Sequence, residues 1–206
     1  MTKSIVLLLS FAAFAASAAD LEKAPAPQPV NKVCPVKGNP VNPKCTTEYE
    51  GRTYAFCTGG CRKEFTEKLH ASIYYQLGGQ PAIDAAVELF YKKVLADERI
   101  KHFFDDINMN AQKRKQKAFL SAAFGSPVKW EGKDMRKAHE DLDINETHFN
   151  AVAEDLQATL TEMKVKKELI DQIMAIAGSV KDDVLHRTPA AKLLAQPVQT
   201  KPAAGS

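Results

Sequence analysis

The chain has 206 residues, of which 45% are hydrophobic and 26% are charged. This composition is too apolar for an intrinsically disordered chain, and the length suits one domain of moderate size together with a smaller one. The formal net charge is only +3 and the basic residues are dispersed, so the composition gives no indication of a nucleic-acid-binding protein.

The first residues have the pattern of an export signal. Lys3 provides a short basic region, residues 5–16 are apolar, and Ala16-Ser17-Ala18 is a small-residue cleavage signature. The apolar run is shorter than the about 20 residues that a membrane-spanning helix needs. We therefore expect residues 1–18 to be a cleaved signal peptide, no membrane span in the mature chain, and export, most simply to a bacterial periplasm. An uncleaved membrane anchor is the alternative.

Composition divides the rest of the chain into four segments. Residues 19–32 are rich in proline and predict an extended tether, and residues 188–206 form an Ala-, Pro- and Gln-rich tail that we expect to be disordered. Residues 33–70 hold all four cysteines among glycines and short apolar pairs, a pattern typical of small strands and turns. Residues 72–187 carry apolar stripes at helical spacing, which predict an all-α domain of about five or six helices.

The cysteine segment carries a specific motif. It reads Cys34-Pro-Val-x-Gly-x-Pro-Val, then Tyr49-Glu-Gly, then Tyr54-x-Phe-Cys57-x-x-x-Cys61. This string resembles the YHS and TRASH family of small metal-binding modules. The resemblance implies a cysteine-rich α+β module with Cys34, Cys57 and Cys61 as metal ligands and Cys45 as a candidate fourth. Thiolates are soft ligands, so zinc or cuprous copper is the expected metal.

Disulfide bonds are the alternative use of these cysteines. An exported protein with an even number of cysteines often pairs them. Cys57 would then pair with Cys61, and Cys34 with Cys45. The sequence does not decide between metal binding and disulfides.

The helical segment contains five motifs in a fixed order. They are Tyr75-x-Leu-Gly-Gly-x-x-Ala-Ile, Phe90-Tyr91, Arg99-x-x-x-Phe103-Phe104, Gln112-x-x-x-Gln116-Lys-Ala-Phe119-Leu and Met135-x-x-x-His139. In order and spacing they resemble the group I truncated haemoglobins, the cyanobacterial members above all. The resemblance covers nearly all of residues 72–186. It implies a two-over-two helical sandwich around b-type haem (iron protoporphyrin IX).

The resemblance makes His139 the ligand to the haem iron from the proximal side. Met135 lies one turn before it and Leu142 nearly one turn after it, which suits an apolar wall beside a porphyrin. A neutral imidazole nitrogen is a good ligand for haem iron. Taken alone, His139 has the setting of a surface histidine, because charged residues stand on both sides of it in the sequence.

The resemblance assigns the distal side of the haem to two helices. Tyr91 would donate a hydrogen bond to a bound diatomic ligand, and Gln112 and Gln116, four residues apart on one helical face, would add further donors. An ordinary core aromatic is the alternative for Tyr91. The remaining candidate haem contacts are apolar side chains: Phe90, Phe103, Phe104, Phe119, Met135 and Phe149. Of these, Phe103, Phe104 and Phe119 are equally consistent with a plain hydrophobic core.

Lys115 stands where cyanobacterial relatives carry a second iron-coordinating histidine. A lysine amine binds iron only when it is deprotonated, which costs roughly 4–5 kcal/mol at pH 7 from an ordinary pKa of about 10.4. Burial over the haem would lower that cost, and an algal member of the family has a lysine at this position. Lys115 is therefore a candidate second iron ligand. Alternatively it belongs to the solvated basic run of residues 113–117 and faces a haem propionate.

These patterns together predict an exported b-type haem protein that binds diatomic ligands, dioxygen and nitric oxide. Nitric oxide dioxygenation or a peroxidase-like reaction is the enzymatic alternative. It needs an external reductase, since the chain has no glycine-rich nucleotide-binding fingerprint. A metal-handling or sensing protein that works through the cysteine module is a third hypothesis.

Overall fold

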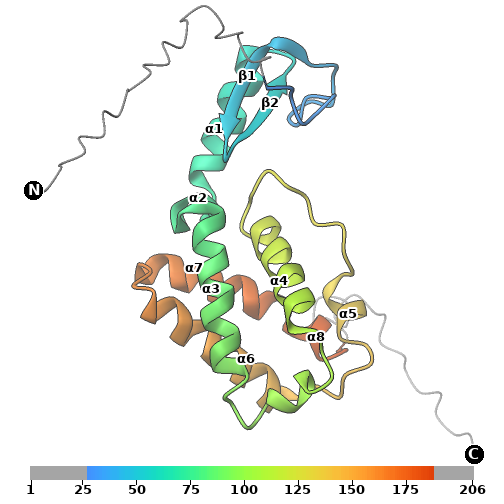
Figure 1. The fold of residues 1–206 in the computed structure, drawn as a ribbon, viewed down its shortest axis with the longest axis vertical. Helices are drawn as coiled ribbons and strands as arrows, with labels where there is room; N and C mark the ends of the chain where they lie inside the picture. The colour runs from blue at the N-terminus through green and yellow to red at the C-terminus, as the bar shows by residue number, and fades with distance from the viewer. Residues whose placement is uncertain (1–26, 188–206) are drawn as a thin grey trace, which may run out of the picture. The chain divides into compact units, whose positions relative to one another are not determined.

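The computed structural model describes residues 27–187. The predicted signal peptide, most of the predicted tether and the tail of residues 188–206 lie outside the described residues. The chain forms two compact units, one ending at Arg62 and the other beginning at Lys63. In chain order the elements in Figure 1 are β1 (Asn42–Tyr49), β2 (Arg52–Phe56), α1 (Gly59–Ala71), α2 (Ile73–Leu77), α3 (Gly79–Val94), the 3-10 helix η1 (Lys101–Phe104), α4 (Met109–Ala123), α5 (Met135–Ala138), α6 (Glu146–Glu162), α7 (Lys167–Ser179) and α8 (Lys181–Val184).

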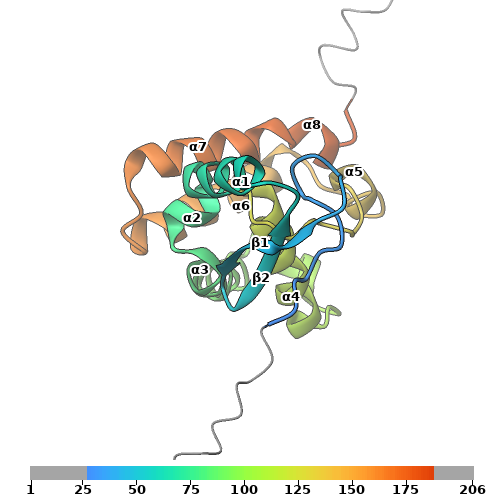
Figure 2. The ribbon, with the colours of Figure 1, turned by 90° about the horizontal axis from the view of Figure 1, so that it is seen from above.

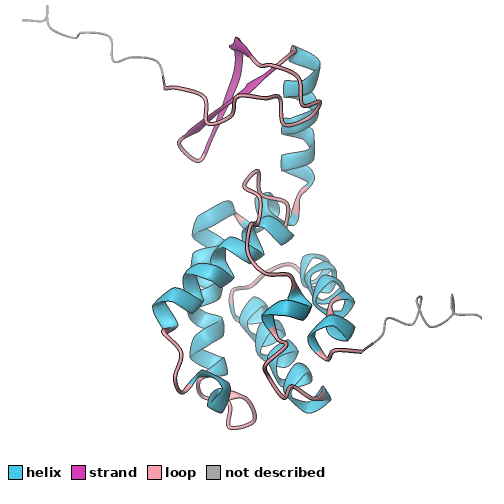
Figure 3. Cartoon of the chain, turned by 90° about the vertical axis from the view of Figure 1, so that its right-hand side faces the viewer, coloured by secondary structure: helices cyan, strands magenta, loops and turns pink. Residues whose placement is uncertain are grey.

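The smaller unit is built on a two-stranded antiparallel hairpin, drawn in magenta in Figure 3. Glu50 and Gly51 join the strands with φ angles of 47° and 70°. Positive φ at both positions is the geometry of the two-residue turn that fits the twist of a hairpin. The register shifts between Asn42 and Thr46, so β1 carries an irregular stretch that contains Cys45. A small sheet joined to α1 agrees with the α+β class expected for the cysteine segment.

The larger unit is an all-α domain made of two helix pairs. Helix α3 packs on α4, α6 packs on α7, and α3 also packs on α6, so that the two pairs contact each other. Helix α8 follows α7 and lies beside α5, as Figures 1 and 2 show. This arrangement confirms the expected two-over-two helical sandwich. The helices outnumber the five or six predicted, because α2, α5 and α8 are single turns of four or five residues and too short to show a periodicity.

Local capping signals set several of the helix starts. The side chains of Asn108, Asp134 and Asn145 each accept a hydrogen bond from a backbone N–H three residues further on, at the starts of α4, α5 and α6. At α6, His148 completes a capping box by accepting a hydrogen bond from the N–H of Asn145. Helix α7 includes Gly178 and ends at Ser179.

The hydrophobic core of the larger unit lies mainly where α3, α6 and α7 meet. Its buried apolar side chains on these helices include Ile83, Val87, Val94, Leu160, Ile170 and Ile173. Helix α4 contributes little to this core and buries only Ser121. Among the described residues, none of the helices combines the length and the apolar character that crossing a bilayer requires.

Gly125 follows α4 at a position that tolerates no side chain. Its φ is +92°, and a Cβ atom there would lie 2.9 Å from the Cβ of Ser72. We predict that Gly125→Ala lowers the free energy of unfolding by about 1–3 kcal/mol, because backbone strain and the steric overlap add.

The matched control for this prediction is Gly178→Ala. Gly178 lies within α7 and a Cβ there would meet nothing within 4 Å. Since alanine is the better helix former, this change should raise the free energy of unfolding by about 0.5 kcal/mol. Urea unfolding followed by circular dichroism measures both, and two variants of equal stability would contradict the prediction.

Candidate functional site

His139 lies at the C-terminal end of α5 and is held in one tautomer. Its Nδ1 atom is 2.6 Å from the carbonyl oxygen of Met135. A carbonyl oxygen only accepts hydrogen bonds, so Nδ1 carries a proton, and in the neutral imidazole the lone pair is on Nε2. Nε2 has no hydrogen-bond partner among residues 27–187, and the side chain is half-buried. A neutral imidazole oriented by its other nitrogen is the arrangement that histidine metal ligands use.

Tyr91 is buried in the larger unit, and its hydroxyl is oriented by an amide. The Nε2 of Gln112 donates a hydrogen bond to the Tyr91 hydroxyl at 3.0 Å, and the rings of Phe90 and Phe104 pack edge-on at centroid distances of 5.3 and 5.8 Å. Burial raises the pKa of Tyr91, and the hydrogen bond from Gln112 opposes that effect only in part. The phenol therefore stays protonated, and its hydrogen is available for a further acceptor.

Several apolar side chains of this domain are only half-buried by the protein. On α4, Phe119 is half-buried, and on α6, Phe149 and Leu156 are half-buried although Leu160, further along the same helical face, is buried. Helices in a globular domain normally bury one continuous apolar face. Three further residues that were predicted to contact haem are also half-buried: Phe103, Phe104 and Met135. Half-buried apolar side chains of this kind can be covered further by a ligand.

Neighbours that the sequence analysis did not single out surround two of these phenylalanines. The Phe103 ring contacts His102 and His148, with centroid distances of 4.2 and 4.9 Å, and the two histidine rings lie 5.8 Å apart. The Phe119 ring packs edge-on against Trp130 at 5.7 Å. Trp130 is the one tryptophan of the chain. Its rarity is the only feature of the sequence that could have drawn attention to it.

Lys115 differs from the lysines on either side of it. Lys113 and Lys117 both form ion pairs with Glu88 of α3, at 2.6 and 3.0 Å. Lys115 is exposed and makes no ion pair or hydrogen bond within residues 27–187, and neither does the half-buried Gln116. Unlike its neighbours, the Lys115 amine therefore forms no salt bridge with α3.

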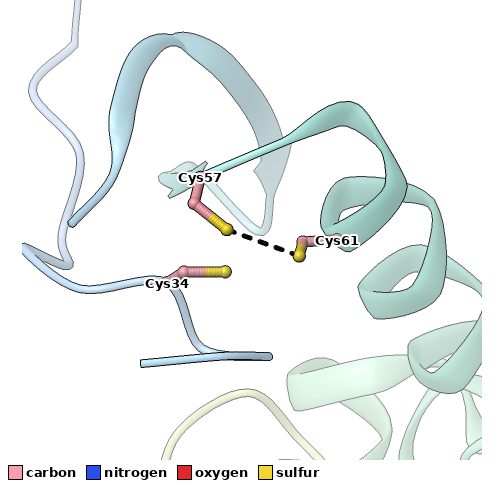
Figure 4. A group of neighbouring side chains, drawn as sticks. All are labelled: Cys34, Cys57 and Cys61. Atoms are coloured by element: carbon pink, nitrogen blue, oxygen red, sulfur yellow. Dashed lines mark hydrogen bonds between the residues drawn. The ribbon is translucent and has the colours of Figure 1, made fainter. Parts of the chain in front are cut away.

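Three of the four cysteines converge in the smaller unit. Cys34 lies in the loop before β1, Cys57 directly follows β2, and Cys61 lies in the first turn of α1. Figure 4 shows their sulfur atoms pointing toward one another. All three Sγ atoms lie within 4.8 Å of one another, and those of Cys57 and Cys61 are 3.5 Å apart. Cys45 lies in the irregular part of β1, outside this cluster, and the four described cysteines are free thiols.

The surroundings of Cys34 favour its thiolate. Burial opposes ionisation, but backbone N–H groups of Cys57, Lys37 and Val36 hydrogen-bond the sulfur, and the net effect lowers the pKa of Cys34 to about 6. The hydrogen bond with Cys61 is the largest of the effects that raise the pKa of Cys57. The cluster thus combines one ionised sulfur with two further soft donors, a combination that suits a soft metal ion.

Comparison with known proteins assigns the larger unit to a family. A model of the bacterial-like globins matches residues 72–186, more than half of the chain. This chain belongs to the bacterial-like globin family. Within that family the domain is a group 1 truncated haemoglobin. It is 50% identical over 123 residues to the group 1 truncated haemoglobin GlbN of Synechocystis sp., a match that covers 57% of this chain and 99% of that protein.

Solved structures share the fold of this globin domain. The 2/2 haemoglobin from Synechococcus sp., in its cyanomet state and with covalently attached haem, has 48% identity and a TM-score of 0.55, covering 57% of this chain and all of that one. The truncated haemoglobin from Tetrahymena pyriformis in its Fe(III) form has 43% identity and a TM-score of 0.54, covering 55% and 97%. The family match begins at residue 72, so the YHS and TRASH resemblance of the cysteine segment stays a prediction.

The environment of Tyr91 predicts that its hydroxyl ionises at a higher pH than the other tyrosines. Because burial raises the pKa of Tyr91, we expect its phenolate absorbance near 295 nm to appear at the alkaline end of a spectrophotometric titration of the haem-free globin. Tyr91→Phe should remove that last phase, whereas Tyr75→Phe, at a position 41% exposed, should leave it in place. Circular dichroism at each pH confirms that the fold persists. Loss of an early phase in Tyr91→Phe would contradict the described burial.

Proposed function

We propose that the globin domain binds b-type haem through Nε2 of His139 and thereby binds diatomic ligands, dioxygen and nitric oxide. The hydrogen bond from His139 Nδ1 to the carbonyl of Met135 carries this proposal, because it leaves Nε2 with a lone pair and a fixed direction. When bound, the haem iron supplies the coordination position at which a diatomic molecule attaches. The residues of this chain decide how the haem is held and what surrounds that molecule.

The half-buried apolar side chains support a porphyrin as the occupant. A porphyrin is a flat apolar ring, and covering Phe119, Phe149 and Leu156 with it removes apolar surface from water at about 25 cal/mol per Å². The donor set fits as well, because one neutral imidazole beside apolar walls is the environment in which proteins hold haem iron for gas binding.

The pair of Tyr91 and Gln112 supports the binding of a diatomic ligand that would carry partial negative charge when bound. Gln112 holds the Tyr91 hydroxyl as an acceptor, which leaves the phenol proton to donate to a partly negative ligand atom. Since Tyr91 is buried, such a hydrogen bond forms away from water and is correspondingly strong. This pair stabilises a bound ligand, and we therefore propose binding in preference to enzymatic turnover.

The His139 proposal is tested by titrating haem-free protein with hemin. The unaltered chain should take up one haem and develop a Soret band. His139→Ala should weaken hemin affinity about 100-fold or more, because the side chain that would bond to the metal is gone. His70→Ala, at an exposed position of α1, is the control and should bind like the unaltered chain. Equal affinity and equal spectra for all three would contradict the proposal.

We also propose that the amine of Lys115 would bind the haem iron together with His139 in the resting protein. Its freedom from ion pairing supports this, since Lys113 and Lys117 are held by Glu88 while Lys115 is not. Deprotonation of the amine is the main cost, which burial against a porphyrin lowers.

The Lys115 proposal predicts a low-spin ferric spectrum for the unaltered chain between pH 6 and 10. Lys115→Ala should convert this spectrum to a high-spin form, because the amine that would complete the coordination is removed. Lys113→Ala, which removes a lysine two positions away, should stay low-spin. A low-spin spectrum that survives in Lys115→Ala would show that another group is the ligand.

For the smaller unit we propose that Cys34, Cys57 and Cys61 bind one soft metal ion. The convergence of three sulfur atoms within 4.8 Å supports this proposal. Because no further His, Cys, Asp or Glu among the described residues joins the cluster, cuprous copper is the favoured ion: it accepts three thiolates, whereas zinc in a closed site takes four protein ligands. The N-terminal sequence pattern supports export, where oxidation of Cys57 and Cys61 to a disulfide competes with metal binding.

The metal proposal is tested on full-length protein reduced and handled without oxygen. Titration with Cu(I) against a competing chelator should give one tightly bound ion, and Cys34→Ser should weaken binding at least tenfold because a thiolate ligand is lost. Cys45→Ser is the matched control and should bind like the unaltered chain, since Cys45 lies outside the cluster. Equal binding by Cys34→Ser, or loss of binding in Cys45→Ser, would contradict the proposed ligand set.

A further inference from the structure

The helix that carries His139 has little hydrophobic anchorage of its own. Helix α5 is four residues long and none of these residues is buried. The described element against which it packs extensively is α8. A helix this short is unstable in isolation. Its direction, and with it the direction of the His139 side chain, therefore depends on the contacts that its side chains make.

Arg136 makes the polar contacts between α5 and the end of the domain. Its Nε donates a hydrogen bond to the carboxylate of Asp183 at 3.2 Å. Its Nη2 donates to the backbone carbonyls of Asp182, at 3.4 Å, and Arg187, at 2.5 Å. One guanidinium thus collects three acceptors from α8 and from the residues that follow it, using the planar fork that only arginine offers.

The segment that receives Arg136 is itself fixed to the start of α6. Glu146 forms ion pairs with Arg187, at 2.7 Å, and with Lys181, at 3.5 Å. The Lys181 amine also lies over the ring of Phe149, 5.4 Å from its centroid. Val184 of α8 is buried. A continuous set of contacts therefore leads from α5 through α8 to α6, one of the main helices of the sandwich.

We propose that Arg136 is a positioning residue for His139, which sets the strength of the bond between the histidine and the haem iron by fixing α5 against α8. This inference rests on the proposed haem binding. Arg136 lies between Met135, whose carbonyl orients the imidazole, and His139 itself. A tilt of α5 displaces the imidazole and its hydrogen-bond acceptor together, so loss of Arg136 weakens the bond to iron and makes it heterogeneous.

The effect of Arg136 is local. The side chains of Arg136 and Asp183 are 40% and 47% exposed, and ion pairs at such exposure contribute little to global stability. Arg136 variants should therefore unfold at nearly the same denaturant concentration as the unaltered chain. The bond between His139 and iron should nevertheless change, because α5 has few other contacts that hold it.

The test uses the full chain with the substitution Lys115→Ala, which removes the other proposed iron ligand. In the ferrous state the iron–histidine bond can then be observed on its own. Arg136→Ala should shift and broaden the iron–histidine stretching band in the resonance Raman spectrum. It should also speed haem transfer to an excess of a haem-scavenging apoprotein by about three- to tenfold, because the contacts of an arginine at this exposure are individually weak. Arg136→Lys should fall between, since lysine keeps the charge but not the fork.

Arg99→Ala is the matched control. Arg99 is 43% exposed and pairs with Asp97 and Glu154, so its loss removes a comparable surface network away from α5. It should leave the stretching band in place. If Arg136→Ala does not fold, Asp183→Asn tests the same contact by removing the acceptor charge. An unchanged band and transfer rate in the Arg136 or Asp183 variants, or an equal change in Arg99→Ala, would overturn the proposal.

A second readout needs no haem. In the haem-free protein, amide hydrogen exchange of residues 135–139 should accelerate in Arg136→Ala and stay unchanged in Arg99→Ala, because only the first releases α5. If the unaltered chain bound no hemin, the haem proposal would fail while this measurement would still report on the Arg136 contact. Equal exchange in the unaltered chain and in Arg136→Ala would show that Arg136 does not hold α5.

Discussion

The proposed haem site depends on one hydrogen bond, from Nδ1 of His139 to the carbonyl oxygen of Met135. This bond favours the Nδ1–H tautomer of the neutral ring, restricts rotation of the ring and leaves Nε2 as the nitrogen without a hydrogen-bond partner among residues 27–187. A ligand fixed before its metal arrives loses less conformational freedom on binding. Because donor and acceptor lie one helical turn apart, the short helix α5 is sufficient to make the bond. Its orientation within the domain must come from other contacts.

The apolar side chains of the domain fall into two groups, one fully buried and one half-buried. In α3, α6 and α7, side chains such as Ile83, Leu160 and Ile173 are buried by the protein itself, and this burial stabilises the fold. Along α4 and the first turns of α6, apolar side chains such as Phe119 and Phe149 stay half-buried. The fold is thus held by one set of helix contacts while another set of apolar surfaces is left for a ligand. Binding that covers these surfaces stabilises the folded state by mass action.

The sequence predicts the parts of this structure that depend on local pattern. The apolar periodicity of α3 and α6 and the capping residue Asn145 are readable because helix propensity, burial and capping agree there. His139 is different, since its charged neighbours favour a surface position. Only its spacing from the other motifs marks it as a candidate ligand. Contacts between residues far apart in the chain cannot be predicted from local pattern. The hydrogen bond between Arg136 and Arg187 is an example, since 51 residues separate them. Cys45 lies outside the cluster of the other three cysteines, in a stretch of β1 whose register shifts, and composition reveals neither feature.

The most direct test of the central interaction is proton NMR of the hemin-loaded ferric protein with cyanide bound, labelled with ¹⁵N at histidine. If Nε2 of His139 binds the iron and Nδ1 donates to Met135, one histidine N–H proton should be strongly shifted by the unpaired electron and should exchange slowly with water. That signal should disappear in His139→Gln and persist in His70→Ala. Absence of a shifted histidine N–H signal, or its survival in His139→Gln, would contradict the assignment of His139 as the iron ligand.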